Sequence, residues 1–124
     1  LDEFPLPFVI PDRSDRRKSL ISLKKAAGII DGGKNVIMFP EGTRTRDGEI
    51  GSFKKGTFVL ASMANVDLLP IKLENTGKVW NPNKQKITAG KVKVIVGKSI
   101  DTSELNGKNM PEFIEKVRNI VVNL

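Results

Sequence analysis

The chain has 124 residues, a length that allows one domain with a modest core. Of these residues 39% are hydrophobic, and the net charge is +7. It contains no cysteine, which excludes disulfides and thiolate metal sites, and no histidine, the commonest ligand of transition metals. We therefore expect no transition-metal site. No residue pattern in the chain leads us to expect a cofactor. No apolar run approaches the ~20 residues that a membrane-spanning helix needs.

The first part of the chain predicts two strands around one helix. Leu6–Ile10 is a short apolar run that indicates a strand. Asp15–Ile30 has apolar residues at three- and four-residue spacing, typical of a helix that leaves its lysines outside. Ser14 is a suitable N-cap for this helix and Gly32 a suitable stop. Val36–Phe39 is a continuous apolar run, which indicates a strand buried on both faces.

The second part of the chain predicts two helices and two strands. The helices are expected over Gly56–Ala64 and Asn109–Val122, and the strands over Leu68–Leu73 and Lys91–Val96. Pro70 favours an edge position or a bulge in the first of these strands. Lys91–Val96 alternates basic with apolar residues, so one of its faces is wet. Residues 75–90 are polar and indicate a loop, in which Trp80 fits either the rim of the core or a membrane interface.

This order of elements predicts the fold class and the place of a ligand. Alternating strands and helices indicate an α/β fold with a mainly parallel sheet flanked by helices, in a single domain over residues 1–124. In such sheets ligands bind outside the carboxyl ends of the strands. Asp12-Arg13 and Pro40–Arg46 both follow expected strand ends. If their strands are neighbours, Arg13, Arg44 and the Gly42 backbone surround a single anion.

The segment Phe39–Arg46, with the sequence Phe-Pro-Glu-Gly-Thr-Arg-Thr-Arg, carries the strongest chemical signal. Gly42 lets the backbone turn or a ligand approach it closely, and Thr43 offers a hydroxyl beside it. Arg44 can bind two phosphate oxygens at once through its planar guanidinium. Glu41 only accepts hydrogen bonds, so it could hold a guanidinium or accept a substrate hydroxyl. The alternative is an ordinary exposed connection, in which Asp47-Gly48 makes a tight turn.

The positive charge forms two clusters along the sequence. Residues 13–25 hold six basic side chains against one acid, Asp15, and a second cluster comprises Arg44, Arg46, Lys54 and Lys55. Such surfaces attract anions, namely lipid headgroups, a phosphate substrate, an acyl carrier or nucleic acid. The alternative for the first cluster is a solvated helix face. For the second cluster, the neighbouring Gly42-Thr43 favours a functional role.

Four blocks of the sequence resemble the glycerolipid acyltransferase family, which includes 1-acylglycerol-3-phosphate acyltransferase. Phe39–Arg46 matches the family's Phe-Pro-Glu-Gly-Thr-Arg-Ser/Thr pattern, and Phe53–Phe58 matches its Phe-Lys-x-Gly block. Pro11–Ser14 resembles the family's strand that ends in an Asp-Arg pair, and Leu69-Pro70-Ile71 resembles a later apolar-Pro-apolar block. The order and approximate spacing of all four blocks agree over residues 8 to about 100.

One departure from the family pattern changes the expectation. The family's catalytic motif, a His followed after four residues by an Asp, lies before the Asp-Arg block, and this chain has no histidine. We therefore expect the chain to be the C-terminal portion of an acyltransferase domain, an incomplete domain without catalytic residues of its own. Asp12 and Glu41 lie beside arginines, and we do not expect either to replace the missing base. A natural truncation or an inactive relative is the alternative.

The resemblance implies acyl transfer from acyl-coenzyme A or acyl carrier protein to lysophosphatidic acid or glycerol 3-phosphate, in phospholipid synthesis. It implies work at the cytoplasmic face of a membrane, with the protein peripheral or anchored by a segment outside this chain. The expected substrate-binding residues are Arg13, Glu41, Gly42, Thr43, Arg44 and Lys54. The remaining alternative is a catalytically inactive, basic membrane- or nucleic-acid-binding module. The absence of tyrosine and the single tryptophan count against nucleic acid as a partner.

Overall fold

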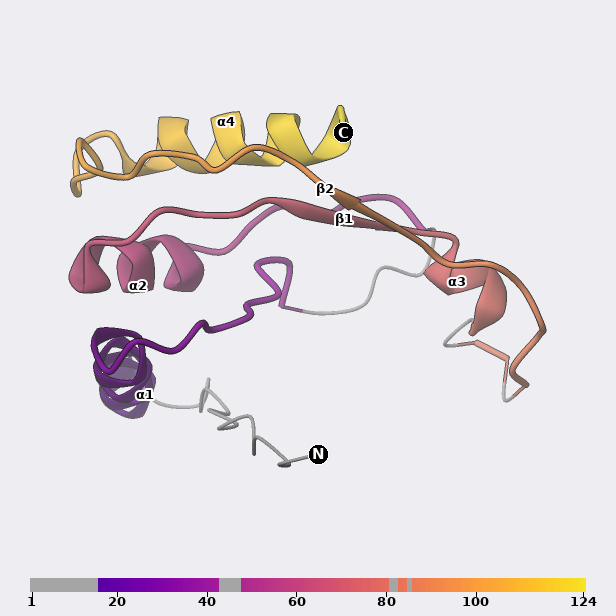
Figure 1. The fold of residues 1–124 in the computed structure, drawn as a ribbon, viewed down its shortest axis with the longest axis horizontal. Helices are drawn as coiled ribbons and strands as arrows, with labels where there is room; N and C mark the ends of the chain where they lie inside the picture. The colour runs from indigo at the N-terminus through magenta and orange to yellow at the C-terminus, as the bar shows by residue number, and fades with distance from the viewer. Residues whose placement is uncertain (1–15, 43–47, 81–82, 85) are drawn as a thin grey trace.

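The computed structural model describes residues 16–42, 48–80, 83–84 and 86–124. Three helices pack at one end, and a hairpin of two strands extends from them (Figure 1). The helices are α1 (Arg16–Asp31), α2 (Gly56–Ala64) and α4 (Met110–Val122). The strands β1 (Ile71–Glu74) and β2 (Lys93–Val96) are connected through the one-turn helix α3 (Thr76–Val79). The predicted strand Leu6–Ile10 and the N-cap Ser14 lie outside the described residues.

The first helix confirms the prediction from its apolar spacing. Helix α1 packs against α2 and buries Ala26 there. Its last carbonyls are capped by the two glycines that follow, since the Gly32 N–H donates to the Gly28 carbonyl and the Gly33 N–H to the Ile30 carbonyl. Gly33 has a φ of +90°, a backbone conformation that favours glycine. Gly32 is thus part of the helix stop, as its position predicts.

The core lies between α2 and α4, and both helices have nearly the bounds that the sequence predicts. Phe58 of α2 is 1% exposed and packs with Leu105 and Val117. Its ring meets Phe113 of α4 edge to face, with centroids 6.1 Å apart and an interplanar angle of 82°, a favourable aromatic geometry. Helix α2 ends at Asn65, whose left-handed φ of 51° turns the chain out of the helix.

The only sheet among the described residues is antiparallel, so the expected parallel pairing is wrong for these strands. Ile71 pairs with Val96 and Leu73 with Val94. Residues 75–92, which include α3, reverse the chain between β1 and β2, so the two strands run in opposite directions. Pro70 precedes β1 and accepts a hydrogen bond from the Gly97 N–H at 2.9 Å. The predicted loop 75–90 contains α3, which is too short to show helical periodicity.

The prediction of a buried strand over Val36–Phe39 is also wrong in the described structure. These residues have no regular structure, and the side chains of Ile37 and Phe39 are 71% and 75% exposed. A strand needs a hydrogen-bonded neighbour to form, and no described segment pairs with this one. The apolar side chains of Val94 and Val96 are likewise exposed, although alternation along β2 predicts that they face a core.

Candidate functional site

The described beginning of the Phe39–Arg46 motif is a tight turn. The Gly42 N–H donates to the Phe39 carbonyl at 3.1 Å, and Gly42 has a φ of +74°. The Pro40 carbonyl accepts from the Lys54 N–H at 2.8 Å, which fixes the start of the motif against the segment that returns from it. The backbone of Gly42 therefore adopts a conformation that favours glycine, as the sequence predicts for this position.

The side chain of Glu41 binds the backbone of the segment that follows the motif, at Gly51. Its carboxylate oxygen Oε2 accepts a hydrogen bond from the Gly51 N–H at 3.0 Å. A charge-assisted bond of this kind is about twice as strong as a neutral one. The sequence suggests a guanidinium or a substrate hydroxyl as the partner of Glu41, but the partner in the structure is a backbone N–H. Glu41 thus connects the turn at Gly42 to Gly51.

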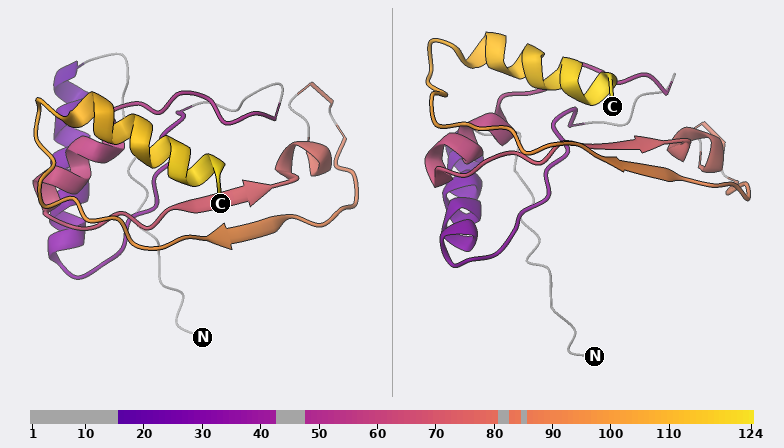
Figure 2. Two further views of the ribbon diagram at one scale, coloured as in Figure 1. Left: turned by 90° about the horizontal axis from the view of Figure 1, so that it is seen from above. Right: turned by 45° about the horizontal axis from the view of Figure 1, so that its top comes forward.

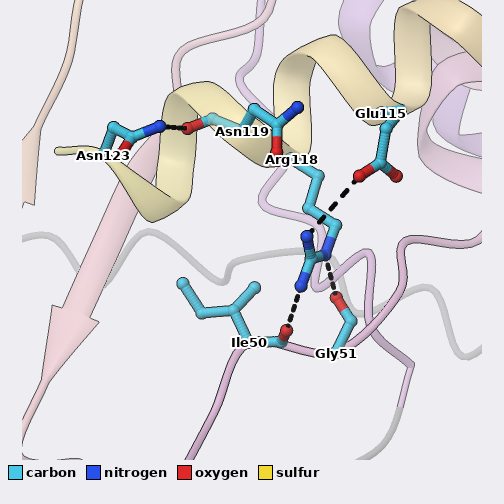
Figure 3. Close-up of polar contacts among 6 residues, drawn as sticks. All are labelled: Ile50, Gly51, Glu115, Arg118, Asn119 and Asn123. Atoms are coloured by element: carbon cyan, nitrogen blue, oxygen red, sulfur yellow. Dashed lines mark hydrogen bonds and ion pairs between the residues drawn. The ribbon is translucent and has the colours of Figure 1, made fainter.

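Arg118 of α4 completes this support from the other side (Figure 3). Its Nε donates to the Gly51 carbonyl at 2.9 Å and its terminal nitrogen Nη2 to the Ile50 carbonyl at 2.7 Å. Its other terminal nitrogen, Nη1, lies 3.6 Å from a carboxylate oxygen of Glu115, one turn earlier on the helix. The Gly51 residue is thus bound through its N–H by Glu41 and through its carbonyl by Arg118. This connects the motif to a helix about 70 residues later in the sequence.

Sequence reasoning missed Arg118. The signal that could have found it is its place in α4, directly after the buried Val117, where an arginine at the edge of an apolar stripe needs acceptors. Those acceptors are backbone carbonyls, which no side-chain pattern identifies. Arg118 is therefore a residue that only the three-dimensional structure assigns to the motif.

The predicted site residues divide between those that the structure places and those outside it. Glu41, Gly42 and Lys54 lie together, because the Lys54 backbone bonds to Pro40 beside them. The Lys54 side chain is exposed. Arg13, Thr43 and Arg44 lie outside the described residues, so the predicted meeting of Arg13 with Arg44 stays a prediction.

The described part of the site is suited to binding and positioning rather than to proton transfer. The carboxylate of Glu41 is engaged by the Gly51 N–H, and no group of three acidic, cysteine or histidine side chains that could hold a metal occurs among the described residues. In the part of the chain that the structure describes, no helix is long and apolar enough to cross a membrane.

Comparisons with known proteins agree with the motif. The chain is 41% identical over 98 residues to a chloroplastic 1-acyl-sn-glycerol-3-phosphate acyltransferase of Arabidopsis thaliana, covering 77% of this chain and 28% of that protein. It is 33% identical over 115 residues to a 1-acyl-sn-glycerol-3-phosphate acyltransferase of Saccharomyces cerevisiae, covering 90% and 38%.

The fold resembles that of a solved acyltransferase. The crystal structure of the 1-acyl-sn-glycerophosphate acyltransferase of Thermotoga maritima matches with a TM-score of 0.75 and 26% identity, over 86% of this chain and 43% of that one. The chain thus has a glycerolipid-acyltransferase-like α/β fold and spans less than half of the length of these relatives. The acyltransferase family model matches residues 5–74, more than half of the chain, and the protein therefore belongs to the glycerolipid acyltransferase family.

Proposed function

We propose that the intact protein transfers an acyl group from acyl-coenzyme A or acyl carrier protein to 1-acylglycerol 3-phosphate in phospholipid synthesis. Residues 1–124 supply the C-terminal portion of the acyltransferase domain. The observation that carries the proposal is the Phe39–Arg46 motif, whose described start is bonded to the Lys54 N–H through Pro40 and to the Gly51 N–H through Glu41. A binding residue such as Gly42 that is already held in place loses less entropy when a ligand binds.

In this proposal the chain binds the glycerol phosphate, and it does not supply the general base that removes the proton of the acceptor hydroxyl. Arg44 and Arg13 bind the phosphate oxygens, Thr43 and the Gly42 backbone contribute hydrogen bonds, and Lys54 adds positive charge. Glu41 holds Gly51 beside the start of the motif. Glycerol 3-phosphate is the alternative acceptor, because it presents the same phosphate group.

The chemical step needs a general base, which this chain does not contain, since it has no histidine. In the reaction the acceptor hydroxyl oxygen attacks the thioester carbonyl, an ester bond forms, and the carbon–sulfur bond breaks. The base takes the hydroxyl proton and the thiol leaves with a proton, so atoms and charges balance. We therefore infer that the base lies in a part of the enzyme outside these residues, and that the chain alone is inactive. Protein-dependent acylation of lysophosphatidic acid by the pure chain would refute that inference.

A matched pair of variants in the full-length enzyme tests the phosphate role. Arg44→Ala removes charge-assisted bonds, and we expect about a ten- to hundredfold loss in acceptor affinity or rate. Lys34→Ala changes an exposed lysine in the turn after α1 and should have little effect. Arg44→Lys should recover only part of the loss, because it keeps the charge but not the planar fork. Equal, small effects of both alanine variants would indicate that the motif is an ordinary exposed turn and does not bind the phosphate.

We also propose that the protein works at the cytoplasmic face of an anionic membrane, either peripherally or anchored by a segment outside this chain. The net charge of +7 supports an anionic partner. A basic module that binds nucleic acid without catalysis is the competing function. Filter binding of an oligonucleotide with a salt titration tests the competing function: retention that falls steeply with salt supports a nucleic-acid-binding module, and no retention at low salt contradicts it.

A further inference from the structure

The hairpin arm, defined as residues 71–100 with β1, α3 and β2, carries an uneven share of the charge. Between Asn75 and Ile100 it has no carboxylate and six lysines, against a net charge of +7 for the whole chain; they are Lys78, Lys84, Lys86, Lys91, Lys93 and Lys98. The arm projects away from the packed helices, with α3 at its far end (Figures 1 and 2). The positive potential is therefore concentrated on the part of the molecule that extends furthest into solvent.

Three of these lysines surround a hollow at the far end of the arm. Lys78, Lys84 and Lys86 line a hollow of about 380 Å³ together with Gly77 and Thr88, and all three lysines are exposed. Ammonium groups that share a hollow repel one another, and an anion placed between them relieves that repulsion. A phosphate group is the commonest biological anion with enough oxygens to meet several ammonium groups at once.

Two large apolar side chains lie beside these lysines. Trp80 is 52% exposed and Ile87 is 68% exposed, and the two residues face each other in an isolated antiparallel bridge. The Thr88 N–H donates to the Val79 carbonyl at 2.8 Å and closes the same turn. The position of both side chains is therefore set by backbone pairing. We call Lys78, Trp80, Lys84, Lys86 and Ile87 the basic tip.

We propose that the basic tip binds the surface of an anionic lipid bilayer. The lysines lie among the headgroup phosphates, where each contributes roughly 1 kcal/mol of attraction. Trp80 and Ile87 enter the interfacial region, where an indole buries its apolar body and keeps its N–H near water. This inference takes the anionic membrane as a partner from the proposed function. It goes further in identifying the basic tip as the surface that binds the membrane.

The combination of lysines with two exposed apolar side chains favours an anionic bilayer over other anionic partners. A nucleic acid backbone satisfies the lysines but offers no apolar layer for Ile87. A bilayer offers charge at the headgroups and apolar material directly beneath them, in the order that the tip presents. The basic face of α1 is the competing surface in this protein, because Ile21 is exposed there next to Lys24 and Lys25. That face has no aromatic residue.

The single tryptophan makes the test direct. Trp80 is the only tryptophan and the chain has no tyrosine, so its fluorescence reports on the tip alone. The 124-residue chain is titrated with vesicles of phosphatidylcholine and with vesicles of phosphatidylcholine containing phosphatidylglycerol. We expect a blue shift of the emission and protection from aqueous quenchers with the anionic vesicles only, both reversed by salt. An emission that does not change on bound vesicles would overturn the proposal.

Three charge-reversal pairs then locate the binding surface. Lys84→Glu/Lys86→Glu should weaken partitioning into anionic vesicles about tenfold or more. Lys108→Glu/Lys116→Glu makes the same change of charge on exposed lysines near the start of α4 and in it, and should change partitioning less than about threefold. If Lys24→Glu/Lys25→Glu causes the large loss instead, the bilayer binds α1 and the proposal is wrong.

Two further measurements keep the result clear. Trp80→Ala should reduce sedimentation with anionic vesicles, with circular dichroism confirming that the variant is folded. If the tip binds an oligonucleotide at concentrations where it does not bind vesicles, its partner is nucleic acid and the proposal of a lipid bilayer is wrong. Acyl transfer by the intact enzyme to a detergent-solubilised acceptor is measured separately. If the enzyme is active but its tip does not bind vesicles, the proposed role of the basic tip is wrong and the proposed acyltransferase function is unaffected.

Discussion

The helical end and the hairpin arm contain similar apolar residues but use them differently. The buried hydrophobic residues of the described core are Ala26, Phe58, Leu60, Ala61, Leu105 and Val117, and none belongs to the arm. In the arm, four of the apolar strand residues are nearly half exposed or more, with Val94 at 59%, and Ile95 is half-buried; the four are Ile71, Leu73, Val94 and Val96. The helices have a second layer to pack against, whereas one face of the hairpin has none. Burial here follows from the neighbours that a segment finds, more than from its own composition.

The two faces of the hairpin sharpen this contrast. The register places Ile71, Leu73, Val94 and Val96 on one face, which is exposed. On the opposite face, Lys72 donates through Nζ to the Val122 carbonyl at 3.0 Å and to the Leu124 carbonyl at 3.4 Å. The end of α4 therefore lies over the more polar face of the hairpin. Helix α4 contributes to the core between Met110 and Val117, and the carbonyls at its end bind Lys72 of the arm.

The largest expected effect separates the core from the arm. Phe58→Ala leaves a cavity beside Phe113 and should lower the free energy of unfolding by about 3–5 kcal/mol. Val94→Ala removes an exposed side chain and should change it by no more than about 0.5 kcal/mol. Urea denaturation of both variants measures the difference. Similar losses for both would mean that the exposed face of the hairpin is covered in solution.

The next effect tests whether Arg118 belongs to the motif as well as to the helical end. Arg118→Met removes two hydrogen bonds from a charged group, and we expect a loss of about 1.5–3 kcal/mol in stability. In the full-length enzyme it should raise the KM for the acceptor more than it lowers kcat, because Arg118 positions the loop and does not touch the reacting atoms.

The controls for Arg118 lie in the same group of residues. Arg118→Lys keeps one donor position and should restore part of the acceptor KM. Glu41→Gln keeps the size of the side chain but weakens its bond to the Gly51 N–H, so it should shift KM in the same direction. If Arg118→Met lowers stability and leaves KM unchanged, Arg118 serves the fold alone.

A smaller effect tests the contact between the arm and the end of α4. A Cβ at Gly97 would lie 2.9 Å from side-chain carbons of both Pro70 and Leu124. Gly97→Ala should therefore cost about 1–3 kcal/mol of stability, because neighbouring atoms must shift. Gly77→Ala places a methyl group where no atom lies within 4 Å, and should be nearly neutral. Thermal unfolding of the two variants is the comparison. An equally small shift for both would show that the end of α4 is not held against the arm.

The sequence predicts the helical end better than the arm, and the reason is the range of the interactions. The apolar spacing of α1, α2 and α4 is local, and the bounds of α2 agree residue for residue with the prediction. The pairing of Val36–Phe39 depends on a strand elsewhere, which no local pattern supplies. At the site, the turn at Gly42 follows from the motif itself. The bonds from Arg118 to Ile50 and Gly51 join residues 67 and 68 positions apart, beyond what spacing can indicate.

The smallest effect concerns the turn that joins the arm to the helical end. Asp101 accepts hydrogen bonds from the Ser103 N–H at 2.8 Å and from its hydroxyl at 3.1 Å, and these bonds lower the pKa of Asp101 below its ordinary value of 3.8. Because the pKa is lower in the folded state, the stabilisation is fully present above pH 3.8 and is lost as the pH falls through the folded value. The side chain is exposed, so the change in stability should be small. Ser103→Ala removes the hydroxyl bond and keeps the stronger effect of the backbone N–H, so the pKa should return only part of the way. NMR titration of the Asp101 carboxyl in both proteins measures this, and identical titration curves would mean that the Ser103 hydroxyl makes no bond in solution.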